Sequence, residues 1–279
     1  MKNIKSFTSI INESRKREEI IISDLKDIRE RYGYPRRTLI EDGEEALIEE
    51  ETIEEAPAYF LMDRMGYCRL IDPATYEKNR EAVDTENRYI IETTNLGRIL
   101  IFTDTGEMHL LKCRQVPYKK LREKGMPVDN LTKYKASEAE IVFIGSDTEL
   151  KDKLLMFMTE GGMIKLVPFE EFETNNRTVA ATRLEEGDRI VSIETVSELG
   201  MNTVAVWTDN GYFLRFALDD VSILKKNSKG VKAISLKKGA KALGARVVRD
   251  DPVVMNNGTP VHLNQLKTAL RGGVGSKHK

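Results

Sequence analysis

The 279-residue chain is poor in the side chains that build disulfide frameworks, metal centres and nucleophilic active sites, with two cysteines and three histidines. Cys68 and Cys113 fall in or beside predicted strands, so we expect a reducing cytoplasm and no disulfide framework. The histidines have no metal-ligand spacing and no serine or cysteine partner pattern. We therefore expect no metal site and no catalytic residue, and interpret His109 and His262 as ordinary strand residues.

Long hydrophobic runs and export signals are also missing. The longest apolar runs, such as residues 154–158, fall far short of the ~18 residues that a membrane helix needs. The N-terminus is polar and has no cleavage-site pattern. The C-terminal RGGVGSK has serine before lysine, unlike a phosphate-binding P-loop. We expect a cytoplasmic chain with no membrane partner, no cofactor and no small-molecule substrate.

The net charge is −1, but the two signs are separated along the chain. Residues 221–279 contain thirteen lysines and arginines against two aspartates, a net charge of +11. Residues 41–55 contain nine acidic residues and no basic one. The basic end predicts a polyanionic partner. We hypothesise that Glu49, Glu50 and Glu51 compete with this partner for the basic surface.

The first part of the chain predicts an amphipathic helix over residues 4–32. Apolar side chains recur at spacings of three and four, from Ile4, Phe7 and Ile11 onward, and the helix stops at Gly33 and Pro35. One such helix cannot bury its apolar stripe alone. It needs the following domain, a twin helix, or a part of the protein outside this chain.

From residue 58 onward the helical period gives way to five hairpin signals, each an apolar run, a glycine turn and a second run. The turns lie at Gly66, Gly106, Gly161-Gly162, Asn210-Gly211 and Asn257-Gly258. For Asn210-Gly211 we predict a two-residue type I′ turn, which needs positive φ at both central residues. The units repeat every 40 to 56 residues. This period predicts radially arranged β-blades, with unrelated hairpins in a sandwich as the alternative.

A loop with small residues follows each hairpin, and we interpret these loops as basic. Gly125 and Gly230 each lie 19 residues after the turn glycine of their unit. In the third unit Thr178 occupies the equivalent place, and in the fifth the loop is ALRGGVGSKHK. The signatures of WD40 and kelch propellers are absent, so an ordinary propeller is not the best match.

These features resemble the C-terminal region of the A subunit of bacterial type IIA DNA topoisomerases. The segment ending the predicted helix resembles the returning coiled-coil helix of that family, whose Tyr-Gly-x-x-Arg-Arg-Thr pattern is matched by Tyr32, Gly33, Arg36, Arg37 and Thr38. The resemblance implies an all-β fold, a β-pinwheel of five or six blades that exchange strands. The expected organisation is a helical segment at 1–38, an acidic linker, partly strand, at 39–57, and a DNA-binding pinwheel at 58–279.

Within the family, gyrase carries a glycine-rich basic marker loop in the first blade. Here the matching place, residues 75–90, has no glycine, and the single Arg-Gly-Gly lies at Arg271. The resemblance therefore favours a topoisomerase IV A-subunit type, which bends duplex DNA and presents the transported segment. A gyrase-type domain that wraps DNA for negative supercoiling is the alternative, and a propeller-like scaffold for protein partners is a rival from another class.

The resemblance implies contacts to the phosphate backbone from a basic outer rim. The rim candidates are Lys119, Lys120, Arg122, Lys124, Lys225, Lys226, Lys229, Lys232, Lys267, Arg271 and Lys277. Arg69, Lys165 and Arg215, on second hairpin strands, are weaker candidates. The family's catalytic tyrosine has no match here, so the implied partners are duplex DNA, the rest of the A subunit and the ATPase B subunit, in a nucleoid-associated holoenzyme that uses ATP and Mg²⁺ elsewhere.

Overall fold

The computed structural model describes residues 2–35, 38, 54–197, 199–200 and 202–278. The chain divides into two compact units, residues 1–52 and residues 53–279. The expected strand residues Leu47, Ile48 and Ile53 and the hypothesis on Glu49–Glu51 fall outside the described residues.

The described residues of unit 1 form two helices, α1 (Lys2–Asn12) and α2 (Ser14–Tyr32). The predicted single helix is interrupted at Glu13, whose backbone is extended (φ −111°, ψ 108°). Gly33 ends α2 by donating its N–H to the carbonyl of Arg29 at 2.8 Å. The described residues of α2 bury no side chain within the unit, so Ile21, Leu25 and the rest of the apolar stripe are exposed.

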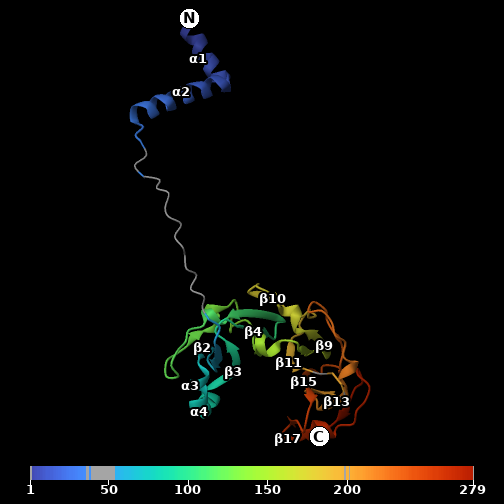
Figure 1. Cartoon of the computed structure of the whole chain (residues 1–279). Coiled ribbons are helices and arrows are strands. Elements are labelled where there is room, and N and C mark those ends of the chain that lie inside the picture. Colours follow the sequence, from blue (N-terminus) through green and yellow to red (C-terminus); the bar gives the residue numbers. More distant parts are fainter. Residues whose placement is uncertain (1, 36–37, 39–53, 198, 201, 279) are drawn as a thin grey trace. The chain divides into compact units, whose positions relative to one another are not determined.

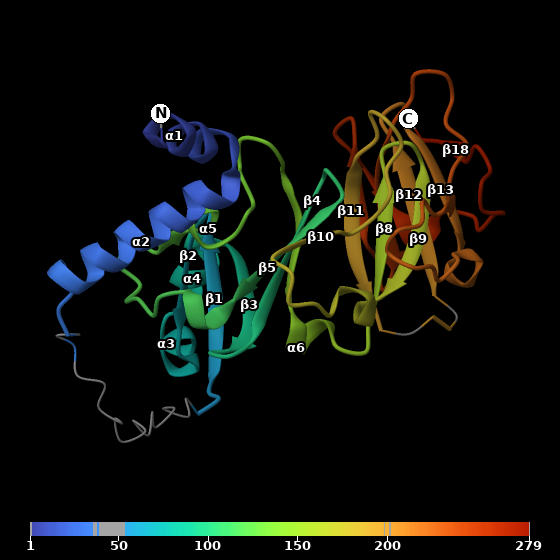
Figure 2. The same ribbon diagram turned by 90° about the horizontal axis from the view of Figure 1, so that it is seen from above.

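Unit 2 is built from five antiparallel sheets, which we call blades 1 to 5 (Figures 1 and 2). Blade 1 has the order β3-β1-β2-β6, with β1 Pro57–Asp63, β2 Tyr67–Ile71, β3 Asn87–Thr94 and β6 Met126–Pro127. Blade 2 has the order β10-β5-β4-β7, with β4 Arg98–Thr103, β5 Glu107–Lys112, β7 Ile141–Ser146 and β10 Thr178–Ala180. Blade 3 has the order β11-β8-β9-β14, with β8 Leu154–Thr159, β9 Met163–Pro168, β11 Ile190–Val196 and β14 Val231–Lys232.

Blade 4 repeats the plan, and blade 5 is a hairpin within the part of the chain that the structure describes. Blade 4 has the order β15-β12-β13-β18, with β12 Thr203–Thr208, β13 Tyr212–Ala217, β15 Ala242–Val248 and β18 Ser276–Lys277. Blade 5 consists of β16 Val253–Asn256 and β17 Thr259–His262. The expected all-β pinwheel is thereby confirmed.

The blades exchange strands in one direction. After each hairpin from the second to the fifth, the chain returns to the preceding blade and adds a short strand to its edge, and these strands are β6, β10, β14 and β18. The chain then turns back to its own hairpin in the second to fourth units, with β7, β11 and β15. Strands β3, β7, β11 and β15 contact one another in that order, so they form the inner side of the arc of blades in Figure 1. The exchanged strands consequently lie on the outer edge.

Apolar side chains fill the spaces between successive blades. Between blades 2 and 3, Phe102 meets Phe157 and Phe172 edge-on, at ring centroid distances of 5.9 and 5.1 Å. All three rings are buried, and each contributes about 1.5–3 kcal/mol by its burial. The stacking of blades therefore supplies the stability that isolated hairpins lack.

The first four hairpin turns share one pattern, in which the turn glycine donates its N–H to the carbonyl three residues earlier, and the turn at Asn210-Gly211 therefore differs from the prediction. Only Gly211 has positive φ there (79°), and its N–H donates to the Thr208 carbonyl at 3.1 Å. The Thr208 hydroxyl accepts from the N–H of Tyr212 and bonds the side chain of Asn210, which stabilises a four-residue turn that ends in a glycine. The predicted type I′ turn is wrong at this position. The fifth hairpin instead has positive φ at both Asn257 and Gly258, which is the pattern of a type I′ turn.

The connection after the first hairpin is helical. It forms α3 (Pro73–Lys78) and α4 (Arg80–Glu86). These helices occupy the place of the gyrase marker loop, which the sequence predicted to be absent. Asp72 caps α3 by accepting from the Thr75 N–H at 2.8 Å, and Pro73 opens the helix. Tyr76 of α3 stacks on Tyr59 of β1 at 4.2 Å. Two further short helices, α5 (Val128–Leu131) and α6 (Asp147–Leu150), lie in the turns back to blade 2 and between blades 2 and 3.

Candidate nucleic-acid interface

The outer edge of unit 2 is made of four equivalent stretches, which we call rim segments 1 to 4 after the blade whose edge each one covers. They are residues 113–127, 169–180, 218–232 and 263–277. Each begins with a 3-10 helix and ends in an exchanged strand. The 3-10 helices are η1 Cys113–Gln115, η2 Phe169–Phe172, η3 Leu218–Asp220 and η4 Leu263–Gln265.

Rim segments 1, 3 and 4 have the same length, because each places a glycine twelve residues after the first residue of its 3-10 helix. These glycines are Gly125, Gly230 and Gly275. A Cβ at each would lie 2.3, 2.7 and 2.4 Å from a backbone oxygen of the strand it joins. Only glycine therefore allows the exchanged strand to approach the blade this closely.

Rim segment 2 departs from this plan. Val179 of β10 pairs with Met108 as Met126 of β6 pairs with Cys68 in blade 1, so Thr178, the first residue of β10, is the equivalent of Gly125. Thr178 follows Phe169 by nine residues, which makes this loop three residues shorter. The segment carries Glu170, Glu171 and Glu173 against the single cation Arg177. The expectation of a basic loop on every blade is wrong here, and the charge count in the sequence was the signal.

Rim segment 1 exposes all four of its predicted cations, Lys119, Lys120, Arg122 and Lys124. Lys119 pairs with Glu123 at 3.3 Å, and the Lys124 ammonium lies 5.7 Å from the Tyr67 ring centroid. Both contacts are at the surface, where ion pairs add little stability. These cations are available to an anionic partner. Arg114 of η1 is also exposed and was not among the sequence candidates.

Rim segment 3 exposes Lys225, Lys229 and Lys232, whereas Lys226 is half-buried. The Lys226 ammonium donates to the Glu171 carbonyl of rim segment 2 at 2.6 Å. Lys229 pairs with Glu185 and lowers the pKa of that carboxyl. Lys226 thus joins two rim segments, and its charged end faces the protein.

Rim segment 4 exposes Lys267 and Lys277. Arg271 is half-buried and donates to the Lys232 carbonyl of rim segment 3 at 2.7 Å. Its Nε is buried without a hydrogen-bond partner among the described residues. Like Lys226, Arg271 connects neighbouring segments.

The weaker strand candidates are not rim cations. Arg69 and Lys165 are buried, with 9% and 1% exposure, and Arg215 is half-buried. Their nitrogens donate to backbone carbonyls of rim segments 1, 3 and 4, respectively. Sequence alone missed this role, because a charge on a strand more often faces solvent.

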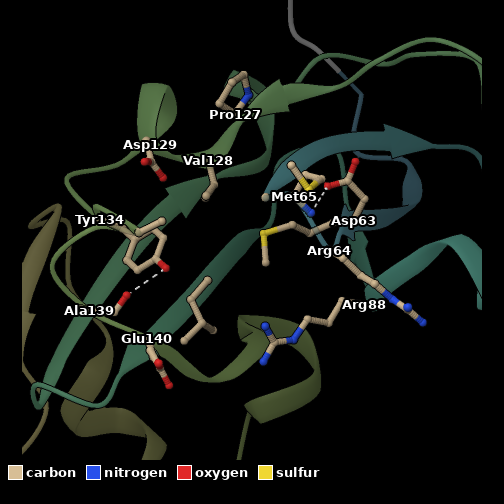
Figure 3. Close-up of a pocket in the computed structure, with 14 residues that line it drawn as sticks. Asp63, Arg64, Met65, Arg88, Pro127, Val128, Asp129, Tyr134, Ala139 and Glu140 are labelled. Carbon is tan, nitrogen blue, oxygen red and sulfur yellow. Dashed lines mark hydrogen bonds between the residues drawn. The ribbon is translucent and has the colours of Figure 1, made fainter.

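A separate hollow of about 410 Å³ lies where the first hairpin turn meets the return path to blade 2 (Figure 3). Its lining mixes apolar residues with charges of both signs, Arg64 and Arg88 against Asp129 and Glu140. The Tyr134 hydroxyl donates to the Ala139 carbonyl at 3.1 Å, and burial raises the pKa of Tyr134. In the described stretches of the chain, no three His, Cys, Asp or Glu side chains are grouped to hold a metal ion. None of the helices within those stretches is long and apolar enough to span a membrane.

Known proteins match both the sequence and the fold. A model of the DNA gyrase C-terminal domain, β-propeller, matches residues 153–197 and 204–249. Gyrase A subunits of Helicobacter pylori J99 and Staphylococcus aureus NCTC 8325 are 26% and 28% identical to this chain over 89% and 93% of it. The chain spans about a third of their length, 31% in both cases.

Solved structures share the fold. The C-terminal domain of a DNA topoisomerase IV superposes with a TM-score of 0.70 at 20% identity, covering 81% of this chain and 73% of that one. The E. coli ParC C-terminal domain gives 0.64 at 16% identity, over 80% and 94%. A DNA gyrase A C-terminal domain gives 0.54 at 16% identity, over 79% and 76%. Residues 153–197 and 204–249 thus match the DNA gyrase C-terminal domain, β-propeller, and unit 2 shares its fold with the C-terminal domains of DNA topoisomerase IV and DNA gyrase A.

Proposed function

We propose that unit 2 binds duplex DNA without sequence specificity along its outer rim and bends it. The observation that carries the proposal is the repeated placement of exposed cations on the outer edges of blades 1, 3 and 4. Lysine and arginine at such positions neutralise phosphates and release counterions. One segment offers too few contacts to offset the bending cost of about 1–6 kcal/mol, so several segments must contact one duplex.

The proposed contacts are uneven along the rim. Rim segment 1 has five cations and one acidic residue, whereas rim segment 2 has three acidic residues and one cation. Rim segments 3 and 4 lie on neighbouring blades and are joined by the Arg271 contact. We therefore assign the main DNA contacts to rim segments 1, 3 and 4, and expect rim segment 2 on blade 2 to bind DNA weakly.

DNA affinity across a salt series tests the binding. The full chain is expected to bind a random-sequence duplex with an affinity that falls log-linearly with salt. Replacing Lys225, Lys229 and Lys232 by glutamate should abolish most of this binding. The matched control replaces Lys78, Lys133 and Lys151, exposed lysines outside the rim segments, and should bind nearly as well as the wild type. Equal loss in both variants would point to net charge instead of the rim.

In the holoenzyme, the proposed role is to present the transported segment for ATP-dependent relaxation and decatenation, as a topoisomerase IV type A subunit. The helical connection α3–α4 in place of a glycine-rich marker loop supports this type. The sequence match to gyrase A subunits supports wrapping for negative supercoiling as the alternative. Assays of the complete A subunit with its ATPase B subunit separate the two. We expect the reconstituted enzyme to relax and decatenate DNA without supercoiling it. Negative supercoiling of relaxed circles would instead establish a gyrase-type A subunit.

A further inference from the structure

Arg69 and Lys165 occupy equivalent places in blades 1 and 3. Arg69 lies opposite Leu61 and Lys165 opposite Phe157, each three residues after the turn glycine of its hairpin. Both side chains are buried, and each holds two carbonyl groups of the loop that crosses its blade edge. Arg69 donates to the carbonyls of Leu121 and Glu123 at 3.0 and 2.7 Å. Lys165 donates to those of Lys226 and Ser228 at 2.6 and 2.9 Å.

The two contacts follow one rule. In both loops the bound carbonyls belong to the residues four and two positions before the rim glycine, Gly125 or Gly230. Each loop also contains the same turn, with the Glu123 N–H on the Lys120 carbonyl and the Ser228 N–H on the Lys225 carbonyl. The buried cation therefore fixes the orientation of two peptide planes in each loop.

Because the four bound carbonyls face the buried cations, the N–H groups of the same peptides face the opposite way. In a trans peptide the N–H points opposite to the preceding carbonyl, and all described peptide bonds are trans. The N–H groups of Arg122 and Lys124, and those of Asn227 and Lys229, thus point away from the buried cations. None of these four N–H groups has a hydrogen-bond acceptor among the described residues. All four residues are exposed.

Blade 4 provides an internal comparison. Leu214 stands at the place of Arg69 and Lys165, opposite Val206, and cannot donate a hydrogen bond. In its loop Gly272, the equivalent of Arg122 and Asn227, donates its N–H to the carbonyl of the buried residue Ala233 at 2.8 Å. In blade 2 the equivalent residue is His109, which contacts the Thr178 hydroxyl at 3.0 Å in the shortened segment. The outward pair thus accompanies the buried cation.

We propose that the N–H groups of Arg122 and Lys124, and of Asn227 and Lys229, are two backbone anchors for DNA phosphates, and that Arg69 and Lys165 are the positioning residues that aim them. Paired backbone N–H groups bind phosphate oxygens without reading a base. The neighbouring exposed cations add charge to the same spot. This proposal rests on the proposed DNA-binding function, and these N–H groups would be the backbone contacts to DNA on blades 1 and 3.

Residue-resolved amide exchange on the full chain tests the anchors directly. With a random-sequence duplex of a few tens of base pairs, the four amides should exchange fast in the free protein and clearly more slowly when bound. Gly272, whose N–H is already bonded, should be protected in both states. Binding without protection of the four amides would overturn the anchors and leave the proposed function intact. Absence of any DNA binding at low salt would overturn both.

Substitution of Lys165 tests the positioning role. Lys165→Met should remove the DNA protection of Asn227 and Lys229, leave that of Arg122 and Lys124, and weaken binding about tenfold. The salt slope should change little because the surface lysines remain, whereas Lys225→Gln should lower it by about 1. Lys165→Arg should retain the protection of Asn227 and Lys229, since an arginine, Arg69, holds the equivalent carbonyls in blade 1. Retained protection in Lys165→Met would contradict the role, and if that variant fails to fold, the wild-type exchange pattern still decides.

Discussion

Lys165 is a single residue with a measurable electrostatic signature. Burial lowers the pKa of its ammonium from 10.5 to about 8, against a smaller opposing effect of Glu171. The native state therefore binds fewer protons than the unfolded state between pH 8 and pH 10.5. Because the unfolded state binds more protons there, this residue makes stability rise with pH across that window, and below pH 8 the full penalty of burying the charge is present.

The prediction is a pH-dependent difference between the wild type and Lys165→Met. Relative to the variant, the wild type should gain roughly 2–3 kcal/mol of unfolding free energy between pH 7 and pH 10. Urea denaturation at several pH values measures it. Taking the difference removes the contribution of the tyrosines, which titrate in both proteins. Parallel stability curves would show that Lys165 keeps an ordinary pKa.

Gly230 provides a second prediction at the residue scale. Its φ is +95° and an added Cβ would lie 2.7 Å from the Ile164 carbonyl oxygen. Gly239 has a similar φ of +79° with nothing within 4 Å, so it is the matched control. Gly239→Ala should cost about 1–2 kcal/mol from backbone strain alone. Gly230→Ala should cost a further 1–3 kcal/mol or so from the clash, in denaturant unfolding. Equal costs would argue against close packing of the exchanged strand.

Residue roles were only partly predictable from the sequence. Exposure of Lys120, Arg122 and Lys225 follows from their place in polar loops. The partners of Lys226 and Arg271 did not follow, because the carbonyls they bind lie 55 and 39 residues away along the chain. The burial of Lys165 was not predictable either, because the carbonyls it binds lie 61 and 63 residues away along the chain.

At the scale of elements, the hairpins were predictable because turn glycines and apolar runs are local signals. The exchanged strands β6, β14 and β18 have two residues each and leave no periodic pattern, so their pairing was known only through the family resemblance. The sequence also contains a start signal for α3, an N-cap residue at Asp72 followed by Pro73. The prediction for this stretch used only its lack of glycine and therefore missed the helix. The prediction of a basic loop failed for rim segment 2 because it followed from the position of the loop in the repeat, whereas the loop itself is acidic.

Rim segment 2 also yields a prediction at this scale. Glu170 and Glu173 are exposed on the outer edge of blade 2, where they would repel the phosphates of a bound duplex. Replacing both by glutamine should tighten DNA binding several-fold at low salt, with a smaller gain at high salt because screening removes the repulsion. Glu81 and Glu86 of α4, also exposed, are the control pair and should leave affinity unchanged. Unchanged affinity in the rim double variant would place the DNA path away from blade 2.

For the whole molecule, the family resemblance anticipated the pinwheel and its strand exchange, and the structure adds how the charge is distributed over it. Rim segments 1, 3 and 4, which carry the exposed cations, follow the outer edge of one arc of blades (Figure 1). A duplex that touches all three must follow that curve. Binding to all three rim segments should therefore bend the duplex, whereas binding to fewer of them should not.

The most direct measurement is energy transfer between fluorophores at the two ends of a random-sequence duplex, with and without the full chain. We expect a shortened end-to-end distance at saturation. When Lys119, Lys120, Arg122 and Lys124, at one end of the arc, are replaced by glutamine, the duplex should stay bound but be nearly straight. A saturated wild-type complex whose duplex stays straight would contradict the claim that the outer rim bends DNA.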